Sequence, residues 1–225
     1  ARPSREMVLQ LADALTIPRG ARNAFLDEVL RPGQRWLVIG SNYFYGSMYI
    51  VVTVFALVWL YRRFPDNYPL WRNTLAIGTL LGLIGFATFP LMPPRLLDVM
   101  GDGHTYYGFV DTLAKYPTFW SFNSGAMKKI SNQFAAMPSL HVAWAAVVAF
   151  GALSASTSRW RWIGMAHLVI TMYVVSATGH HWFLDGIVAL GFIVLSDVAN
   201  VFYAFGDILL LFFLEIGRAS CRERV

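Results

Sequence analysis

The chain has 225 residues, which suits one domain or two small ones. Hydrophobic residues make up 56% of it and charged residues only 14%, against about 25% in a soluble domain, so the composition is typical of an integral-membrane protein. The formal net charge of +5 is too small to favour nucleic acid as a partner.

The two ends of the chain differ from its middle. Residues 1–36 mix apolar and charged residues at roughly helical spacing and begin without Met, which predicts an amphipathic segment at the start of a fragment. Residues 215–225 contain the run IGRASCRERV, which reads as a translated sequencing adapter, so we expect a non-native read-through tail. Without the three arginines and one glutamate of that run, the net charge falls from +5 to +3. The only cysteine, Cys221, also lies there, so no disulfide or thiol chemistry is predicted.

Residues 37–214 form the predicted catalytic domain. A helix that spans a bilayer needs about 20 mostly apolar residues. Five segments meet or nearly meet this length: Leu37–Leu60, Asn73–Met92, Leu140–Ser158, Ile163–Gly179 and Trp182–Phe205. The fold class expected is therefore all-α, a polytopic membrane helix bundle with five visible spans.

The loop charges predict an orientation. Tyr61–Arg72 and Ser158–Trp162 are short and rich in arginine, which is typical of cytoplasmic loops. Alternation of the spans then places the long connection Pro93–Pro138 and the pair His180–His181 on the extracytoplasmic side. The arginines of residues 1–36 disagree with this assignment, but the two short loops carry more weight. Long connections of this kind often cover a site.

Three clusters of residues with side chains suited to catalysis or binding fall on the same predicted membrane face. In the first to be considered, Pro138 and Ser139 precede an apolar run, which indicates a helix start with Ser139 as N-cap. The free N–H groups of a first helical turn form a ready anion site, and His141 lies in that turn. The alternative is a capped helix whose histidine merely meets lipid headgroups.

The second cluster holds His180, His181 and Asp185. Residues four apart share a helix face, and a carboxylate beside an imidazole fixes its tautomer and makes it a better nucleophile. A structural His–Asp pair at the helix start is one alternative. A metal site is another. If both histidines are helical, however, His180 points about 100° away from His181, which disfavours chelation.

The third cluster ends in Arg95, which follows Pro93 and Pro94 at the end of an apolar segment. An arginine there is usually an interface anchor, but its guanidinium also suits a phosphate group. Taken together, the clusters provide charge stabilisation, an activated nucleophile and a proton donor, which are the parts that phosphoryl transfer needs.

The same residues carry a family resemblance. Pro138-Ser139-Leu140-His141 resembles the second signature of the type 2 phosphatidic acid phosphatase superfamily, and the run from His181 to Asp185 resembles the end of its third. Pro93-Pro94-Arg95 is similar to the first motif of the branch that contains fungal inositol phosphorylceramide synthase and many actinobacterial membrane proteins. The resemblance covers roughly residues 37–205.

The resemblance implies a bundle of six spans, one more than is visible, and an extracytoplasmic site without a metal or other cofactor. It implies that His181 attacks phosphorus to give a phosphohistidine, that Asp185 orients it, and that His141 protonates the leaving alkoxide. Arg95 and Ser139 are expected to hold the phosphate, with His180 as a further candidate contact. The sequence departs from the classical pattern at Thr88 and Val175, where a lysine and an arginine are expected, and this leaves the substrate open.

The function predicted is that of a lipid phosphatase or phosphotransferase in the plasma membrane. Its expected partners are the membrane, a lipid phosphate or lipid-linked pyrophosphate, and an acceptor alcohol if the reaction is transfer. Two alternatives remain open. One is a haem protein that uses His141 and His181 as ligands, and the other is a non-catalytic lipid-binding or transport protein.

Overall fold

The computed structural model describes residues 35–97, 109, 111–116, 118, 136–198 and 200. The tail at 215–225 and all but the last two residues of the predicted amphipathic segment lie outside this part of the chain. The elements within it are helical, as an all-α fold requires. In chain order they are α3 (Arg35–Tyr43), the π-helix η1 (Phe44–Met48), α4 (Tyr49–Arg63), α5 (Tyr68–Thr88), η2 (Pro94–Leu96), α7 (Thr112–Lys115), α9 (Leu140–Ala155), η3 (Arg159–Arg161), α10 (Trp162–Ala177) and a helix at 183–198.

Two helices are long and apolar enough to cross a membrane. The first is continuous through α3, η1 and α4 and covers Trp36–Arg63, 28 residues. The second is α5 with 21 residues, which begins five residues before the predicted position because a proline stands in its first turn, where helices accept it. The α5 helix ends at Thr88, shortly before Pro90, because the residue that precedes a proline is disfavoured in helical conformation.

The other three predicted spans are also helices. α9 and α10 have 16 residues each, and the last helix is described over 183–198 and again at 200. At 1.5 Å per residue α9 and α10 reach about 24 Å each, less than the roughly 30 Å of a bilayer core. By length and composition, two of the five predicted spans are therefore supported.

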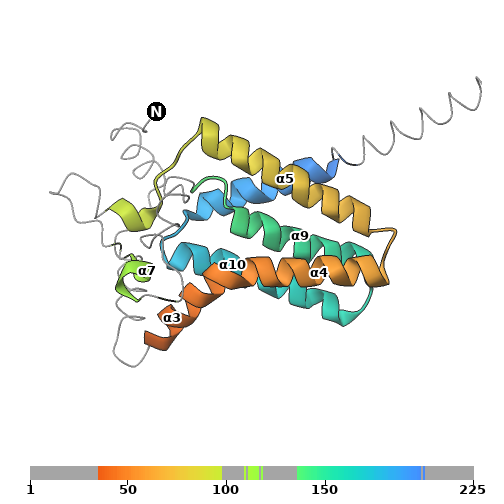
Figure 1. Ribbon diagram of the computed structural model, residues 1–225, viewed down its shortest axis with the longest axis horizontal. Coiled ribbons are helices and arrows are strands. Elements are labelled where there is room, and N and C mark those ends of the chain that lie inside the picture. Colours follow the sequence, from red (N-terminus) through yellow and green to blue (C-terminus); the bar gives the residue numbers. More distant parts are fainter. Residues whose placement is uncertain are drawn as a thin grey trace, which may run out of the picture.

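The centre of the bundle is α9, which packs against α4, α5 and α10 (Figure 1). It is apolar on every side and rich in alanine, as a fully surrounded helix must be. The backbones of α9 and α10 approach closely at Gly164, where a Cβ atom would lie 3.1 Å from the Ala149 Cα. Indole hydrogen bonds join α9 to α5, since Trp144 donates to Thr79 Oγ1 (3.0 Å) and Trp71 donates to Ser154 Oγ (2.8 Å).

The bundle has two chemically different ends. The turn between α4 and α5 and the η3 turn between α9 and α10 meet at the end drawn at the right of Figure 1. We call this the arginine end, after Arg63 of α4 and Arg161 of η3. The opposite end holds η2, α7, the first turn of α9 and the turn at 178–182. We call it the histidine end, after His141, His180 and His181.

Candidate active site

Backbone hydrogen bonds join the three sequence motifs at the histidine end. The Arg95 N–H donates to the Gly179 carbonyl (2.9 Å), and the Ser139 N–H donates to the Asp185 carbonyl (3.1 Å). The segment before the second motif is tied to the first by Ala136, whose N–H donates to the Leu91 carbonyl (3.3 Å). Gly179 has a positive φ of 71°, a backbone conformation that glycine adopts without strain, and it lies against the backbone of Arg95. All six predicted site residues therefore meet at one end of the bundle.

A backbone carbonyl holds His181 in place. Its Nδ1 lies 2.7 Å from the carbonyl oxygen of Ala136, and only an N–H can donate to that oxygen. The neutral ring consequently keeps its lone pair on Nε2, the nitrogen that can act as a nucleophile. The predicted partner Asp185 is close, but its Oδ2 lies 3.6 Å from Nδ1, longer than an ordinary hydrogen bond.

Asp185 is fully buried and organises the start of the last described helix. Its Oδ2 accepts the Trp182 backbone N–H (2.8 Å), and its own N–H donates to the Trp182 carbonyl (3.0 Å). This reciprocal pair closes the first turn in the manner of a capping box. Its other carboxylate oxygen, Oδ1, has no hydrogen-bond partner among the described residues. Asp185 therefore lies beside His181, as predicted. It also stabilises the helix start, which is the structural role that the sequence analysis gave as an alternative.

Two tyrosines that the sequence analysis did not select surround the histidines. The Tyr45 ring stacks on His141 (centroids 4.1 Å apart, planes 20° apart) and also on His180 (4.0 Å, 28°). Tyr49 packs against His141 as well, with the ring centroids 4.3 Å apart. The ring centroids of His141 and His181 are 5.8 Å apart.

Tyr45 belongs to the π-helix η1, whose geometry bears on the candidate site. A π-turn adds one residue to a helical turn and often occurs at functional sites. Here it interrupts the long helix at the level of the histidines, with α-helix on both sides. No pattern in the apolar run marks this turn, so the sequence alone could not have found it.

His180 is buried, and its surroundings favour the neutral ring. Thr178 donates its hydroxyl proton to the Val174 carbonyl (2.6 Å), so its oxygen accepts from His180 Nδ1 (2.7 Å). Burial lowers the pKa of His180 well below 6.5, and the positive charge of Arg95 lowers it further. A neutral ring with its proton on Nδ1 offers an acceptor at Nε2, so His180 would need a second proton to bind a phosphate oxygen from there.

Arg95 is buried in η2, and an acid from the long connection holds it. Its Nη1 donates to Asp111 Oδ2 at 2.7 Å. The other oxygen of Asp111 caps α7 by accepting from the N–H groups of Leu113 and Ala114, both at 3.1 Å. Asn42 of α3 anchors α7 in turn, through its amide and the Thr112 carbonyl (3.0 Å). The guanidinium is thus fixed by contacts that sequence spacing does not reveal.

Ser139 is confirmed as the N-cap of α9. Its Oγ accepts from the Val142 N–H at 3.4 Å, and the residue is completely buried. The helix start that was predicted as an anion site therefore exists, and His141 lies in its first turn. Within the part of the chain that the structure describes, no group of three His, Cys, Asp or Glu side chains is placed to hold a metal ion.

A comparison with models of known protein families identifies the family of this chain. The family model of the PAP2 superfamily matches residues 22–213. The chain belongs to the PAP2 superfamily. The comparisons with curated proteins and with solved structures found no match. Membership supports a phosphatase-type lipid phosphoesterase function and implies a lipid phosphate substrate. The six site residues all fall inside the matched range.

Proposed function

We propose that the chain is an integral-membrane lipid phosphatase that works through a phosphohistidine on His181. The observation that carries this proposal is the hydrogen bond from His181 Nδ1 to the Ala136 carbonyl, because it leaves the Nε2 lone pair for attack. A histidine fixed in this way has the correct tautomer before substrate arrives, so no proton has to leave it first.

The proposed reaction has two steps. In the first, His181 Nε2 forms a bond to phosphorus while the phosphorus–oxygen bond to the lipid breaks, and His141 gives its proton to the leaving alkoxide. In the second, water attacks the phosphohistidine, His141 takes a proton from that water, and inorganic phosphate leaves. The separation of 5.8 Å between the two histidine rings allows a phosphoryl group to lie between them.

The remaining groups position the reactants. Arg95 would balance the charge that develops on the phosphoryl oxygens, and Asp111 fixes its guanidinium. The Ser139 hydroxyl and the first N–H groups of α9 would contribute further donors. Asp185 would stabilise the imidazolium character of His181 across 3.6 Å. His180 would join the phosphate contacts only in its protonated form.

Exposed apolar surface supports a membrane location. Large hydrophobic side chains of α4 and α10 face outward, and such a surface is rare on soluble monomers. The exposed residues on these two helices include Ile50, Val51, Val54, Phe55 and Val58 of α4, and Ile163, Val169, Ile170 and Tyr173 of α10. We propose that all five helices cross the plasma membrane and that the histidine end lies on its extracytoplasmic side.

Phosphoryl transfer to an alcohol is the second candidate, and two positions favour it. Where the classical pattern has a lysine, Thr88 hydrogen-bonds its own helix at the Ile84 carbonyl (2.9 Å). Where it has an arginine, Val175 is a buried apolar residue. Both departures fit the synthase-like branch that the first motif resembles. In this case an acceptor alcohol would replace water in the second step, with the same residues in the same roles.

The test is phosphate release from a panel of lipid phosphates and prenyl pyrophosphates, in detergent with EDTA. We expect His181→Ala to lower the rate by at least about 10³-fold, because a lost nucleophile removes the covalent route. Arg72→Gln, an exposed change at the arginine end, should leave the rate unchanged. Equal release by the wild type and His181→Ala would contradict the mechanism. Adding an alcohol such as inositol distinguishes the transferase, which would form a new phosphodiester.

The same preparations test the two alternatives from other classes. A Soret absorption band that disappears in His141→Ala would establish the haem protein. Lipid binding or transport that survives His181→Ala, without turnover of any substrate in the panel, would establish the non-catalytic protein.

A further inference from the structure

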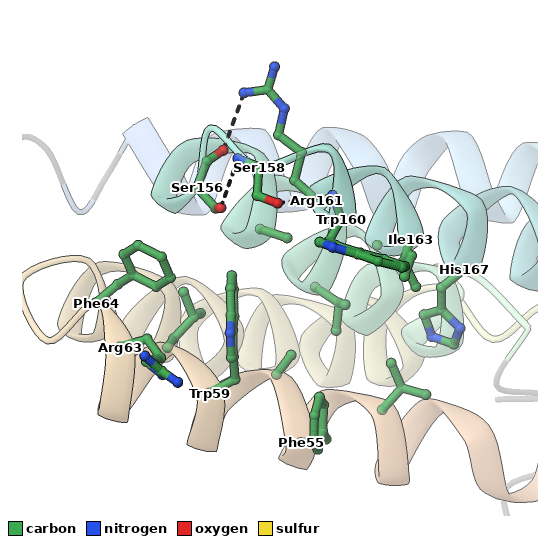
Figure 2. A pocket seen from close by; sticks show the side chains of 16 residues that line it. Phe55, Trp59, Arg63, Phe64, Ser156, Ser158, Trp160, Arg161, Ile163 and His167 are labelled. Atoms are coloured by element: carbon green, nitrogen blue, oxygen red, sulfur yellow. Dashed lines mark hydrogen bonds between the residues drawn. The ribbon is translucent and has the colours of Figure 1, made fainter.

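A groove opens at the arginine end, opposite the histidine end. It lies between α4 on one side and α9 and α10 on the other, and its volume is about 650 Å³ (Figure 2). Its walls are mainly apolar and include Phe55 and Trp59 of α4 and Ile163 of α10. The histidine end contributes no residue to its lining. The groove is therefore separate from the candidate active site.

Positive charge surrounds the mouth of the groove. Arg63 extends from α4, and Arg161 lies in the η3 turn on the opposite wall, with its guanidinium directed away from the groove and donating from Nη1 to the Ser156 carbonyl (3.2 Å; Figure 2). Neither forms an ion pair with any described acid. Trp59 and Trp160 flank the same mouth, and Trp160 is 68% exposed. Arginine and tryptophan at the end of an apolar helix are typical of the headgroup level of a membrane.

A buried polar atom lines the inner part of the groove. His167 of α10 is only 8% exposed, and its Nε2 has no hydrogen-bond partner among the described residues. Buried polar atoms are nearly always hydrogen-bonded, so this nitrogen needs a polar partner, which a bound ligand can supply. His167 follows Arg161 by six residues, which corresponds to about 9 Å along the helix axis. A ligand that interacts with both Arg161 and His167 must carry an anionic group at one end and a second polar group about 9 Å away along the helix axis.

We propose that this groove binds one anionic phospholipid. Its phosphate would lie at the mouth beside Arg63, with Arg161 adding positive charge from the η3 turn, an ester carbonyl would reach His167, and an acyl chain would lie along the apolar wall of α4. The chemistry of a glycerophospholipid fits each of these features in order, from charge through ester to hydrocarbon. The groove lies at the end opposite the histidines, so this site goes beyond the proposed reaction and does not depend on it.

Native mass spectrometry of the delipidated protein in detergent tests the proposal. The probes are phosphatidylglycerol and phosphatidylcholine with identical acyl chains, each titrated against the whole chain. We expect one phosphatidylglycerol to bind in preference to phosphatidylcholine. Each of Arg63→Gln and Arg161→Gln should weaken its binding about fivefold, since a basic residue near an anionic lipid contributes about that factor. The control is Arg72→Gln, a basic residue at the same end outside the groove, which should bind as the wild type does.

A second variant separates groove binding from a general attraction to positive charge. Ala56→Phe fills the groove from the α4 wall without changing the charge, and we expect it to weaken the binding of both lipids. Thermal unfolding of each variant verifies that it is folded. Equal binding of the two lipids by the wild type would overturn the proposal. A loss of phosphatidylglycerol binding in Arg72→Gln as large as in the two groove variants would also overturn it. The same holds for unchanged lipid binding by Ala56→Phe, and for a mass spectrum that shows a protein dimer in place of a lipid adduct.

Discussion

The two ends of the bundle share α4, α9 and α10 but use polar groups in opposite ways. At the histidine end, buried side chains are tied to backbone atoms, as His181 is to Ala136 and Asp185 is to Trp182. At the arginine end, Arg63 is exposed and has no described ion-pair partner. Fixed buried groups provide geometry, whereas a long exposed cation such as Arg63 provides mainly charge. We therefore expect changes at the histidine end to alter rate constants and changes at the arginine end to alter lipid binding.

After the loss of His181, the largest effect is expected at His141. His141→Ala should reduce the rate on alkyl lipid phosphates by about 10²- to 10⁴-fold, the usual contribution of a general acid. The loss should be much smaller for an aryl phosphate such as p-nitrophenyl phosphate, because its leaving group needs no proton. Single-turnover rates on both substrates measure this difference. An equal loss on the two substrates would contradict the role of proton donor.

The next effect concerns the buried pair of Arg95 and Asp111. Arg95→Gln should destabilise the protein by about 3–5 kcal/mol, because it leaves the Asp111 carboxylate without its cation. Adding Asp111→Asn should restore part of this stability, since the unpaired charge is then gone. Thermal unfolding of the two single variants and the double variant gives the coupling energy.

The same double variant separates stability from catalysis. If Arg95 holds the phosphate, phosphate release should stay low in the double variant even where its stability recovers. If activity recovers together with stability, Arg95 is a structural residue, and the phosphate contact must be sought elsewhere.

A smaller effect is expected at Tyr45, which stacks between two histidines. Tyr45→Leu removes two aromatic pairs worth about 0.5–1.5 kcal/mol each, and we expect a loss of stability of that order with a lower kcat. Tyr45→Phe keeps both stacked pairs and should retain most of the activity. Comparison of kcat for the two variants measures the contribution of stacking. A large loss in Tyr45→Phe would instead assign the function to the hydroxyl group.

The residues that the sequence predicted and those that it missed differ in a physical way. Helix positions and the Ser139 cap were predictable because apolar length and N-cap chemistry are local properties. Tyr45 was not, since an aromatic residue inside an apolar run looks like any other span residue until a π-turn directs it inward. Asp111 was hidden for another reason: it lies 16 residues from Arg95, and no sequence spacing predicts a contact across a long connection.

The relation of His181 to Asp185 shows where a local rule reaches its limit. A spacing of four predicts a shared helix face only if both residues are helical. In the structure the helix begins at 183, so His181 precedes it and its ring turns to the Ala136 carbonyl. The carboxylate is still near, at 3.6 Å. The predicted proximity is thus present, while the main orienting group is a backbone atom that a sequence cannot indicate.

The smallest expected effect compares two serine caps, one at each end of the bundle. Ser139 Oγ accepts from Val142 N–H and Ser158 Oγ accepts from Trp160 N–H, both at 3.4 Å. As caps alone, Ser139→Ala and Ser158→Ala should each cost about 1 kcal/mol of stability. If Ser139 also donates to phosphate, only Ser139→Ala should raise KM, because Ser158 lies at the other end. An unchanged KM for both variants would reduce Ser139 to a helix cap and leave phosphate binding to Arg95 and the N–H groups of α9.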